Sequence, residues 1–144
     1  MPYFLLNGVL MEKKEMIGEI KEKTIVAIIK EFVADGAMLQ YNSVGEFKGK
    51  YHANHLETVD VKLKMDGTNE WEVRAMETTM EGDVVMITGK GTGKQENAME
   101  GSFKGEVTYM TNSPRLSWLN NTKAWVEGMT NLKSNEVTMK IYKE

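Results

Sequence analysis

Apolar and polar residues alternate over several short segments of the chain, as expected for strands that bury one face. The clearest segment spans residues 58–65 and ends at Asp66-Gly67, a dipeptide suited to a tight hairpin turn. Residues 70–75 alternate again, and the turn residues Glu81-Gly82-Asp83 separate them from residues 84–88, which are rich in β-branched side chains. These segments predict a three-stranded antiparallel meander.

Three further segments are predicted strands. Residues 103–109 and 137–142 alternate in the same way, whereas residues 122–130 carry apolar side chains on both faces and are expected to lie centrally in a sheet. Many short strands separated by turns every ~8–12 residues favour an antiparallel sandwich or barrel over a fold that alternates strands with helices.

One short helix is predicted near residues 113–120. Ser113 suits the N-cap position, Pro114 suits the first helical turn, and Asn120-Asn121 can end the helix. We expect about two turns.

The region 10–34 has two interpretations. The spacing of Met16, Ile17 and Ile20 suggests a helical stripe, whereas residues 24–32 are rich in β-branched side chains. We prefer two strands on either side of Lys21-Glu22-Lys23, with a helix as the alternative.

Glycines recur at fixed spacing within the predicted strands. Residues 45–49 and 101–105 share the pattern Gly-x-Phe-Lys-Gly, and residues 89–94 repeat the two-residue spacing without the sequence that a phosphate-binding loop requires. Glycine inside a strand marks a bend or the close approach of another backbone, which a small curved barrel needs. We therefore predict an all-β fold in the form of an antiparallel barrel.

The composition excludes several classes of protein. The chain has 144 residues and no cysteine, so thiol nucleophiles, disulfides and thiolate metal sites are absent. A net charge of −3 argues against nucleic acid and anionic membranes as partners. No apolar run approaches the ~18 residues of a membrane span, and the N-terminus lacks the features of a secretory signal. We expect one cytoplasmic domain spanning residues 1–144.

The two histidines of the chain, His52 and His55, lie three residues apart. On a strand they point to opposite faces, so they can bind one metal ion together only if the chain bends there and Glu46, Glu57 or Asp60 supplies a third ligand. We expect no metal site and no cofactor.

Aromatic residues share one face with the glycines of two predicted strands. Phe47 and Tyr51 have this parity on one strand, and Phe103 and Tyr109 have it on the other. If this face is the lumen, the space beside the glycines admits an apolar ligand, and the tyrosine hydroxyls orient its polar end. Glu127 is a further ligand-binding candidate if its face is interior, and a solvated carboxylate if that face is exterior.

Twelve methionines are an unusual number for this length. Methionine is flexible and polarizable, so an interior lined with it can adapt to a ligand, but it also fills gaps in ordinary cores. We prefer the second interpretation.

The order of these features resembles small uncharacterised prokaryotic proteins with an allene-oxide-cyclase-like β-barrel. The resemblance covers residues 10–142 and implies an eight-stranded antiparallel barrel of the calycin type, with a ligand-sized interior and frequent oligomerisation. No catalytic residue is carried over from that family. The elements that carry the resemblance are the Asp66-Gly67 and Gly82 turns, Gly89-x-Gly91-x-Gly93, Gly101-x-Phe103-x-Gly105, Ser113-Pro114-Arg115-Leu116 and Trp118-Leu119-Asn120.

We expect a binding protein for an apolar or amphipathic small molecule. One alternative is an enzyme of the isomerase or cyclase type, in which Glu127, His52 or Tyr109 moves a proton. The other is a barrel filled by its own side chains that acts through its outer surface as a homo-oligomer. Its expected partners are an apolar small molecule and a second copy of the chain.

Overall fold

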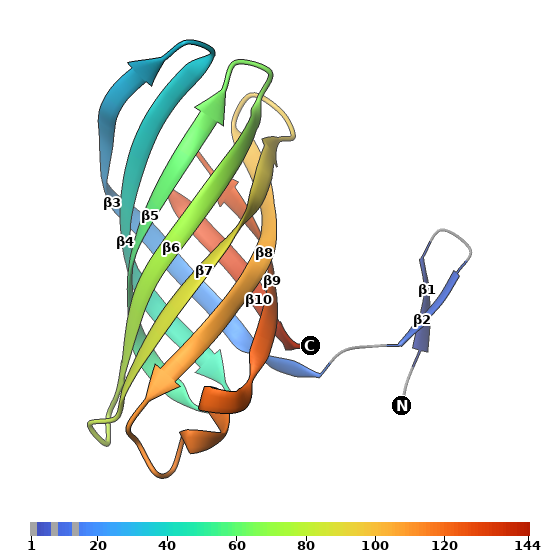
Figure 1. Cartoon of the computed structure of the whole chain (residues 1–144), viewed down its shortest axis with the longest axis vertical. Helices are drawn as coiled ribbons and strands as arrows, with labels where there is room; N and C mark the ends of the chain where they lie inside the picture. The colour runs from blue at the N-terminus through green and yellow to red at the C-terminus, as the bar shows by residue number, and fades with distance from the viewer. Residues whose placement is uncertain (1–2, 7–8, 13–14) are drawn as a thin grey trace.

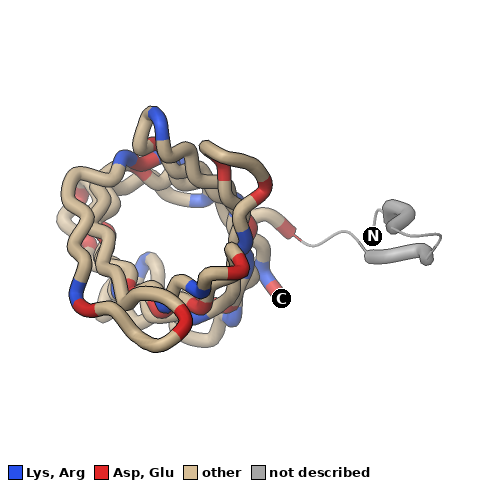
Figure 2. The backbone as a smooth tube through the Cα atoms, turned by 90° about the horizontal axis from the view of Figure 1, so that it is seen from above, with Lys and Arg blue, Asp and Glu red and all other residues tan. Residues whose placement is uncertain are grey.

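Eight antiparallel strands close into a barrel in the computed structural model, which describes the backbone of residues 3–6, 9–12 and 15–144 and the side chains of residues 15–144. The order around the barrel is β10-β3-β4-β5-β6-β7-β8-β9 (Figure 1), and the strands form a continuous ring when seen from above (Figure 2). β1 and β2 form a separate two-stranded sheet. The predicted all-β antiparallel barrel of eight strands is confirmed. The strands are β1 (Tyr3–Leu6), β2 (Val9–Glu12), β3 (Met16–Val33), β4 (Gly36–Gly49), β5 (His52–Lys64), β6 (Thr68–Thr79), β7 (Val84–Gln95), β8 (Glu100–Thr111), β9 (Lys123–Asn131) and β10 (Glu136–Lys143).

The predicted meander is formed by β5, β6 and β7. Asp66-Gly67 joins the first two strands, with Gly67 at a φ of 88°, and Gly82 takes a φ of 92° in the turn between the second and third. The alternation also identifies the faces correctly, because Val61 and Trp71 are buried whereas the neighbouring Lys62 and Glu72 are exposed.

The region 16–33 is one continuous strand, β3, which corrects the expectation of two strands around Lys21-Glu22-Lys23 and rules out the helix alternative. Pairing with β4 along nearly its whole length keeps it extended. Register shifts between Thr24 and Val26 and between Ile29 and Glu31 break the alternation that would have revealed a single strand. Of the rest of the region 10–34, residues 10–12 belong to β2, and residues 13–14 lie outside the described residues.

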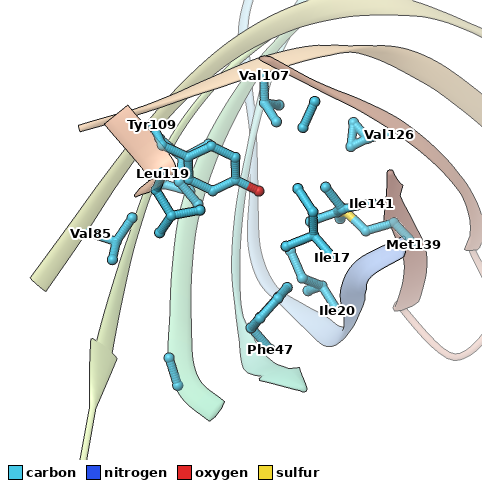
Figure 3. Close-up of a cluster of buried hydrophobic side chains, with 14 of the residues drawn as sticks. Ile17, Ile20, Phe47, Val85, Val107, Tyr109, Leu119, Val126, Met139 and Ile141 are labelled. Carbon is cyan, nitrogen blue, oxygen red and sulfur yellow. The ribbon is translucent and has the colours of Figure 1, made fainter. Parts of the chain in front are cut away.

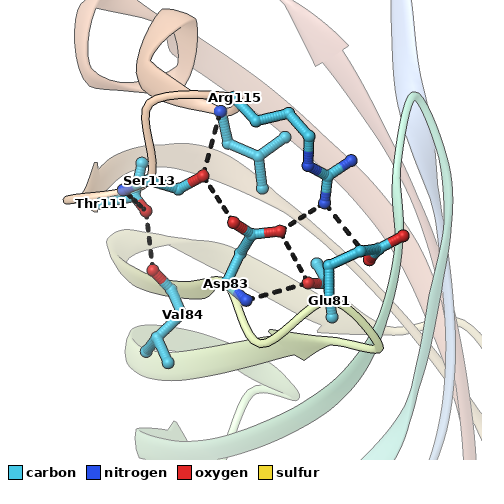
Figure 4. Close-up of polar contacts among 8 residues, drawn as sticks. Glu81, Asp83, Val84, Thr111, Ser113 and Arg115 are labelled. Carbon is cyan, nitrogen blue, oxygen red and sulfur yellow. Dashed lines mark hydrogen bonds and ion pairs between the residues drawn. The ribbon is translucent and has the colours of Figure 1, made fainter.

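The helix is shorter than expected, and it is a 3-10 helix, which is wound more tightly than an α-helix. A 3-10 helix, η1, spans Ser117–Asn121. Ser113 accepts a hydrogen bond from the backbone N–H of Leu116 at 3.3 Å, as a capping residue does, but the helical segment begins only at Ser117. The reason is that the Ser113 hydroxyl also donates to Asp83 in the β6–β7 turn at 2.6 Å, which holds the segment before η1 against that turn (Figure 4).

One end of the barrel is packed solid. Leu116 and Leu119 close this end from the η1 segment, and the core there includes Ile17, Phe47 and Val85 (Figure 3). Asp83 fixes the closure, because it binds Ser113 and Arg115 of the segment that leads into η1 (Figure 4).

Methionine contributes little to this core. Met139 is the one buried methionine among residues 15–144, whereas Met65 and Met80 are more than four-fifths exposed. The expectation that methionine mainly fills the core is therefore wrong.

No helix in the described part of the chain has the length and apolar character needed to cross a membrane.

Candidate functional site

Three ionisable side chains lie in one register row inside the barrel. Glu22 of β3 pairs with Gly45 of β4, Gly45 pairs with His55 of β5, and His55 pairs with Glu77 of β6. Paired residues of antiparallel strands project from the same face of the sheet, and all three ionisable side chains are buried. Glu57, two residues after His55, projects from the same face and is buried as well.

Gly45 allows this row to come together. Glu22 and His55 lie on strands separated by β4, which places their backbones about 9.5 Å apart. A Cβ atom at position 45 would lie 2.5 Å from the Cα and Cβ atoms of Glu22, so only glycine fits beneath the side chains. Glu22 Oε2 thereby reaches to 3.7 Å from His55 Nε2.

His55 is held by two carboxylates. Its Nδ1 atom lies 2.8 Å from Glu77 Oε2, and its Nε2 atom lies 2.7 Å from Glu57 Oε1. Glu77 is fixed in turn by Tyr51, whose hydroxyl donates to Glu77 Oε1 at 2.5 Å. The result is a buried chain of hydrogen bonds from Tyr51 through Glu77 and His55 to Glu57, which we call the Tyr51–Glu57 chain.

The surroundings raise the pKa values of His55 and of the neighbouring Glu22. Burial by itself would lower the pKa of His55, but its hydrogen bonds to Glu57 and Glu77 outweigh burial and raise the pKa to about 10. Burial, reinforced by the charge of Glu57, raises the pKa of Glu22 well above the usual range of a glutamate. Both shifts favour the protonated form, which is the imidazolium for His55 and the neutral acid for Glu22.

Glu22 is the least satisfied member of the cluster. Its side chain has no exposed surface, and within the described residues neither of its oxygens has a hydrogen-bond partner. Tyr109 is the other such group, since its buried hydroxyl also makes no hydrogen bond with any described residue. In Figure 3 this hydroxyl points into the interior from β8. Buried polar atoms without partners are uncommon in native proteins, so their concentration here marks the cluster as more than core packing.

A cavity of about 300 Å³ extends from this cluster through the other half of the lumen. Ser43, His55 and Glu57 line it beside apolar residues such as Val59 and Val73. Residues at the open end of the barrel also line it, among them Gly67 and Asn135 in turns and Gln95 at the end of β7.

A larger depression of about 800 Å³ lies on the outside of the barrel. Its lining mixes lysines such as Lys21 and Lys104 with glutamates such as Glu70 and Glu127, all on the outer face. These opposite charges cancel, and most of the polar lining residues are exposed, so we place the candidate site in the lumen.

The four predicted aromatic residues face the interior. Phe47 and Tyr51 stack with ring centroids 4.4 Å apart and belong with Tyr109 to the packed core, whereas Phe103 lines the cavity and meets Trp71 edge-on at 6.1 Å. Tyr51 also belongs to the polar cluster through Glu77. That these residues bind a ligand stays a prediction.

Glu127 lies on the outer face, so of the two alternatives that the sequence left open it is the solvated carboxylate and does not line the lumen. It is exposed and accepts a hydrogen bond from the indole N–H of Trp125 at 3.0 Å. His52 is also exposed, and its Nε2 atom lies 3.4 Å from Glu46 Oε2. Its side chain therefore points away from the buried His55. The two histidines thus face opposite sides of β5, as the strand parity predicts.

The sequence reasoning missed Glu22 and Glu77 and assigned no site to His55 and Glu57. The alternation of the sequence could have identified them, because each lies on the same strand face as a run of apolar residues. His55 and Glu57 share the parity of Val59 and Val61 on β5. A charged residue at such a position is expected to be buried.

Comparisons with known proteins place the chain among structures of the same shape. No protein-family model matches the chain, and no curated protein is significantly similar to it. Several solved structures share its fold, and three of them do so at low sequence identity. One is a beta-barrel-like protein from Acinetobacter baumannii, with a TM-score of 0.79, 19% identity and coverage of 91% of this chain and 94% of that one.

The other two are described as proteins of unknown function. The protein from Clostridium acetobutylicum has a TM-score of 0.80 at 19% identity, covering 92% of this chain and 99% of that one. The protein from Rhodopseudomonas palustris has a TM-score of 0.79 at 13% identity, covering 91% and 96%. The shared property is the barrel fold. The resemblance to allene oxide cyclases is not confirmed by these structures.

Proposed function

We propose that the barrel binds a small amphipathic molecule in its lumen. The observation that supports this most directly is the cavity of about 300 Å³ that ends on the buried polar cluster. Its volume is at the lower end of the range of small-molecule sites, which combine mostly apolar walls with a few polar groups. Empty space of this size also argues against the alternative of a barrel filled by its own side chains.

The lining sets the chemistry of the ligand. Val59, Val61 and Val73 offer an apolar wall, and Trp71 and Phe103 add aromatic surface. We expect the apolar body of the ligand to contact these residues and its polar end to reach Ser43, His55 and Glu57. Fatty acids and terpenoids are the first compounds to test.

A matched pair of substitutions tests the proposal. Ala75 lines the cavity, and the next residue, Met76, is exposed on the outer face. Ala75→Leu fills part of the cavity, so we expect it to weaken binding of the uncharged dye Nile red at least tenfold, measured by fluorescence titration. Met76→Leu should bind as the wild type does.

The proposal fails if the native protein binds neither Nile red nor any member of a panel of fatty acids and terpenoids. It also fails if Ala75→Leu and Met76→Leu bind the dye equally. Thermal unfolding of both variants shows whether any loss of binding comes from loss of the fold.

Proton transfer at the same site is a second candidate function. Glu57 lines the cavity and is hydrogen-bonded to His55, whose other nitrogen contacts Glu77. This arrangement suits an acid–base pair for isomerisation of a bound molecule. Glu57→Gln should then still bind the small molecule but no longer convert it to an isomer. Chromatography of the bound molecule after incubation measures this conversion.

A further inference from the structure

The polar cluster lacks a partner at one specific place. Both oxygens of Glu22 are buried without a hydrogen bond among the described residues, and its side chain has no exposed surface. An unpaired buried carboxyl is costly in free energy unless another group compensates it. Two other potential ligands, His55 and Glu57, lie beside it.

The three side chains present a compact set of donor atoms. Glu22 Oε2 lies 3.7 Å from His55 Nε2, which lies 2.7 Å from Glu57 Oε1, and one ligand atom from each residue falls within 4.8 Å of the others. Zinc–ligand bonds of about 2.0–2.2 Å place tetrahedral donors roughly 3.4 Å apart. The distance between Glu22 Oε2 and His55 Nε2 is close to this value. The distance between His55 Nε2 and Glu57 Oε1 is that of a hydrogen bond and must increase by less than 1 Å. Glu57 has room for this movement because it lines the cavity.

The support around His55 is the kind that metal-binding histidines have. Its Nδ1 atom is hydrogen-bonded to Glu77, and Tyr51 donates to the other oxygen of Glu77. A carboxylate at this position fixes the orientation of the ring and increases the basicity of the nitrogen that faces the metal. Nε2 is thus the nitrogen directed at Glu22 and Glu57.

We propose that Glu22, His55 and Glu57 form a binding site for one divalent transition-metal ion, with Zn²⁺ as the best-matched ion. The ion replaces the proton on Nε2 of His55 and the proton on Glu22, and both protons leave to solvent. One imidazole and two carboxylates form a mixed ligand set that suits Zn²⁺ better than Mg²⁺ or Ca²⁺, which prefer six or more oxygen ligands. His55 and Glu57 of this set also line the cavity. The proposal stands whether or not the cavity binds an organic molecule.

Equilibrium dialysis of chelator-treated protein against Zn²⁺, followed by elemental analysis, tests the site. We expect one Zn²⁺ per chain in the wild type. Glu22→Gln keeps the shape of the side chain, and neither Glu22 oxygen has a hydrogen-bond partner among the described residues, so the variant should fold and bind Zn²⁺ at least tenfold more weakly. His55→Gln should abolish binding.

The control is His52→Gln. His52 is the other histidine of the chain, and it lies on the surface 3.4 Å from Glu46, so it represents an adventitious His–Glu site. This variant should bind Zn²⁺ as the wild type does. The proposal is overturned if the wild type takes up no stoichiometric Zn²⁺, or if His52→Gln loses the ion while Glu22→Gln keeps it.

A second readout reports on the supporting residues. Co²⁺ in place of Zn²⁺ gives visible absorption whose intensity distinguishes four-coordinate from six-coordinate ions, and we expect the four-coordinate spectrum. Glu77→Gln should weaken metal binding by roughly 10–100-fold, the usual effect of losing a partner behind a histidine ligand. A six-coordinate Co²⁺ spectrum unchanged by Glu22→Gln would also overturn the proposal. These results do not depend on Nile red, so a failure here is separable from a failure of ligand binding.

Discussion

Tyr51 and Tyr109 are both buried in the lumen, but only Tyr51 has a hydrogen-bond partner among the described residues. Tyr51→Phe removes the donor to Glu77 and leaves a buried carboxylate oxygen unpaired, so we expect the free energy of unfolding to fall by about 1–3 kcal/mol. Tyr109→Phe removes a hydroxyl that has no such bond, and the stability should be unchanged or slightly increased.

Urea unfolding of the two variants measures this difference. The substitution is chemically identical at both positions, so each variant is the control for the other. Equal loss of stability would contradict the assignment of Tyr51 as the residue that fixes Glu77.

At the scale of single residues, strand parity predicts orientation well and chemistry poorly. It places Phe47 and Tyr109 inside correctly, because a regular strand alternates its faces without exception. It left the face of Glu127 open, because residues 122–130 are apolar on both sides. It does not show that Glu22 approaches His55, because that contact crosses an intervening strand and depends on Gly45.

Among the elements, the β6–β7 turn and the segment before η1 are joined through Asp83. Hydrogen bonds from Ser113, Arg115 and Thr79 lower the pKa of Asp83 from its ordinary value of 3.8 to about 2. A carboxyl whose pKa is lower in the folded state stabilises the fold above its unfolded pKa. This contribution is lost as the pH falls from about 3.8 to about 2.

Asp83→Asn should therefore have a lower Tm than the wild type at pH 6, and the difference should shrink toward pH 2. Calorimetry across this range makes the comparison. Asp35→Asn makes the same change in the turn between β3 and β4, where the Asp35 side chain has no hydrogen bond or ion pair with a described residue, and it is the control for the amide substitution at pH 6. A constant difference between Asp83→Asn and the wild type at every pH would rule out this role for the Asp83 carboxylate.

Gly105 sets the close approach of β7 and β8. A Cβ atom at this position would lie 2.6 Å from the Trp71 ring and 2.8 Å from the Cα atom of Gly91. Gly105→Val should therefore destabilise the barrel by roughly 1–3 kcal/mol through crowding. Gly101→Val meets only the Thr130 hydroxyl at 2.9 Å and the carbonyl oxygen of Lys94 at 3.4 Å, so a smaller loss is expected. Thermal unfolding measures both, and an unchanged Tm for Gly105→Val would contradict the packing argument.

The elements themselves were predictable wherever the alternation was unbroken. The meander of β5, β6 and β7 followed from parity and turn residues, whereas β3 did not, because its bulges shift the apolar residues from one face to the other. The extent of η1 was also inaccessible, since it depends on contacts between Ser113 and Asp83 that lie far apart in the sequence.

For the whole molecule, the outer face carries a row of apolar side chains on four adjacent strands. Leu56, Met76, Met86 and Met110 are paired in register from β5 to β8, and each is at least 40% exposed. The homo-oligomer expected from the sequence stays a prediction, and this row is where we expect two copies to meet. Light scattering should give about twice the 16.3 kDa of one chain. Met86→Lys should reduce the measured mass to that of one chain. A wild type that is monomeric at every concentration would contradict the prediction.

The pairing of β10 with β3 has a consequence for how the chain reaches this structure. The strands that carry the polar cluster, β3 to β6, are consecutive and can pair as soon as they exist, but the sheet closes only when β10 joins β3. Until then both edges are open to pairing with other chains. This seam joins residues more than a hundred positions apart, such as Ile20 and Met139, so we expect its formation to limit the folding rate. Conditions that slow closure should therefore increase aggregation through these open edges. The polar cluster should still form, because it needs only β3 to β6.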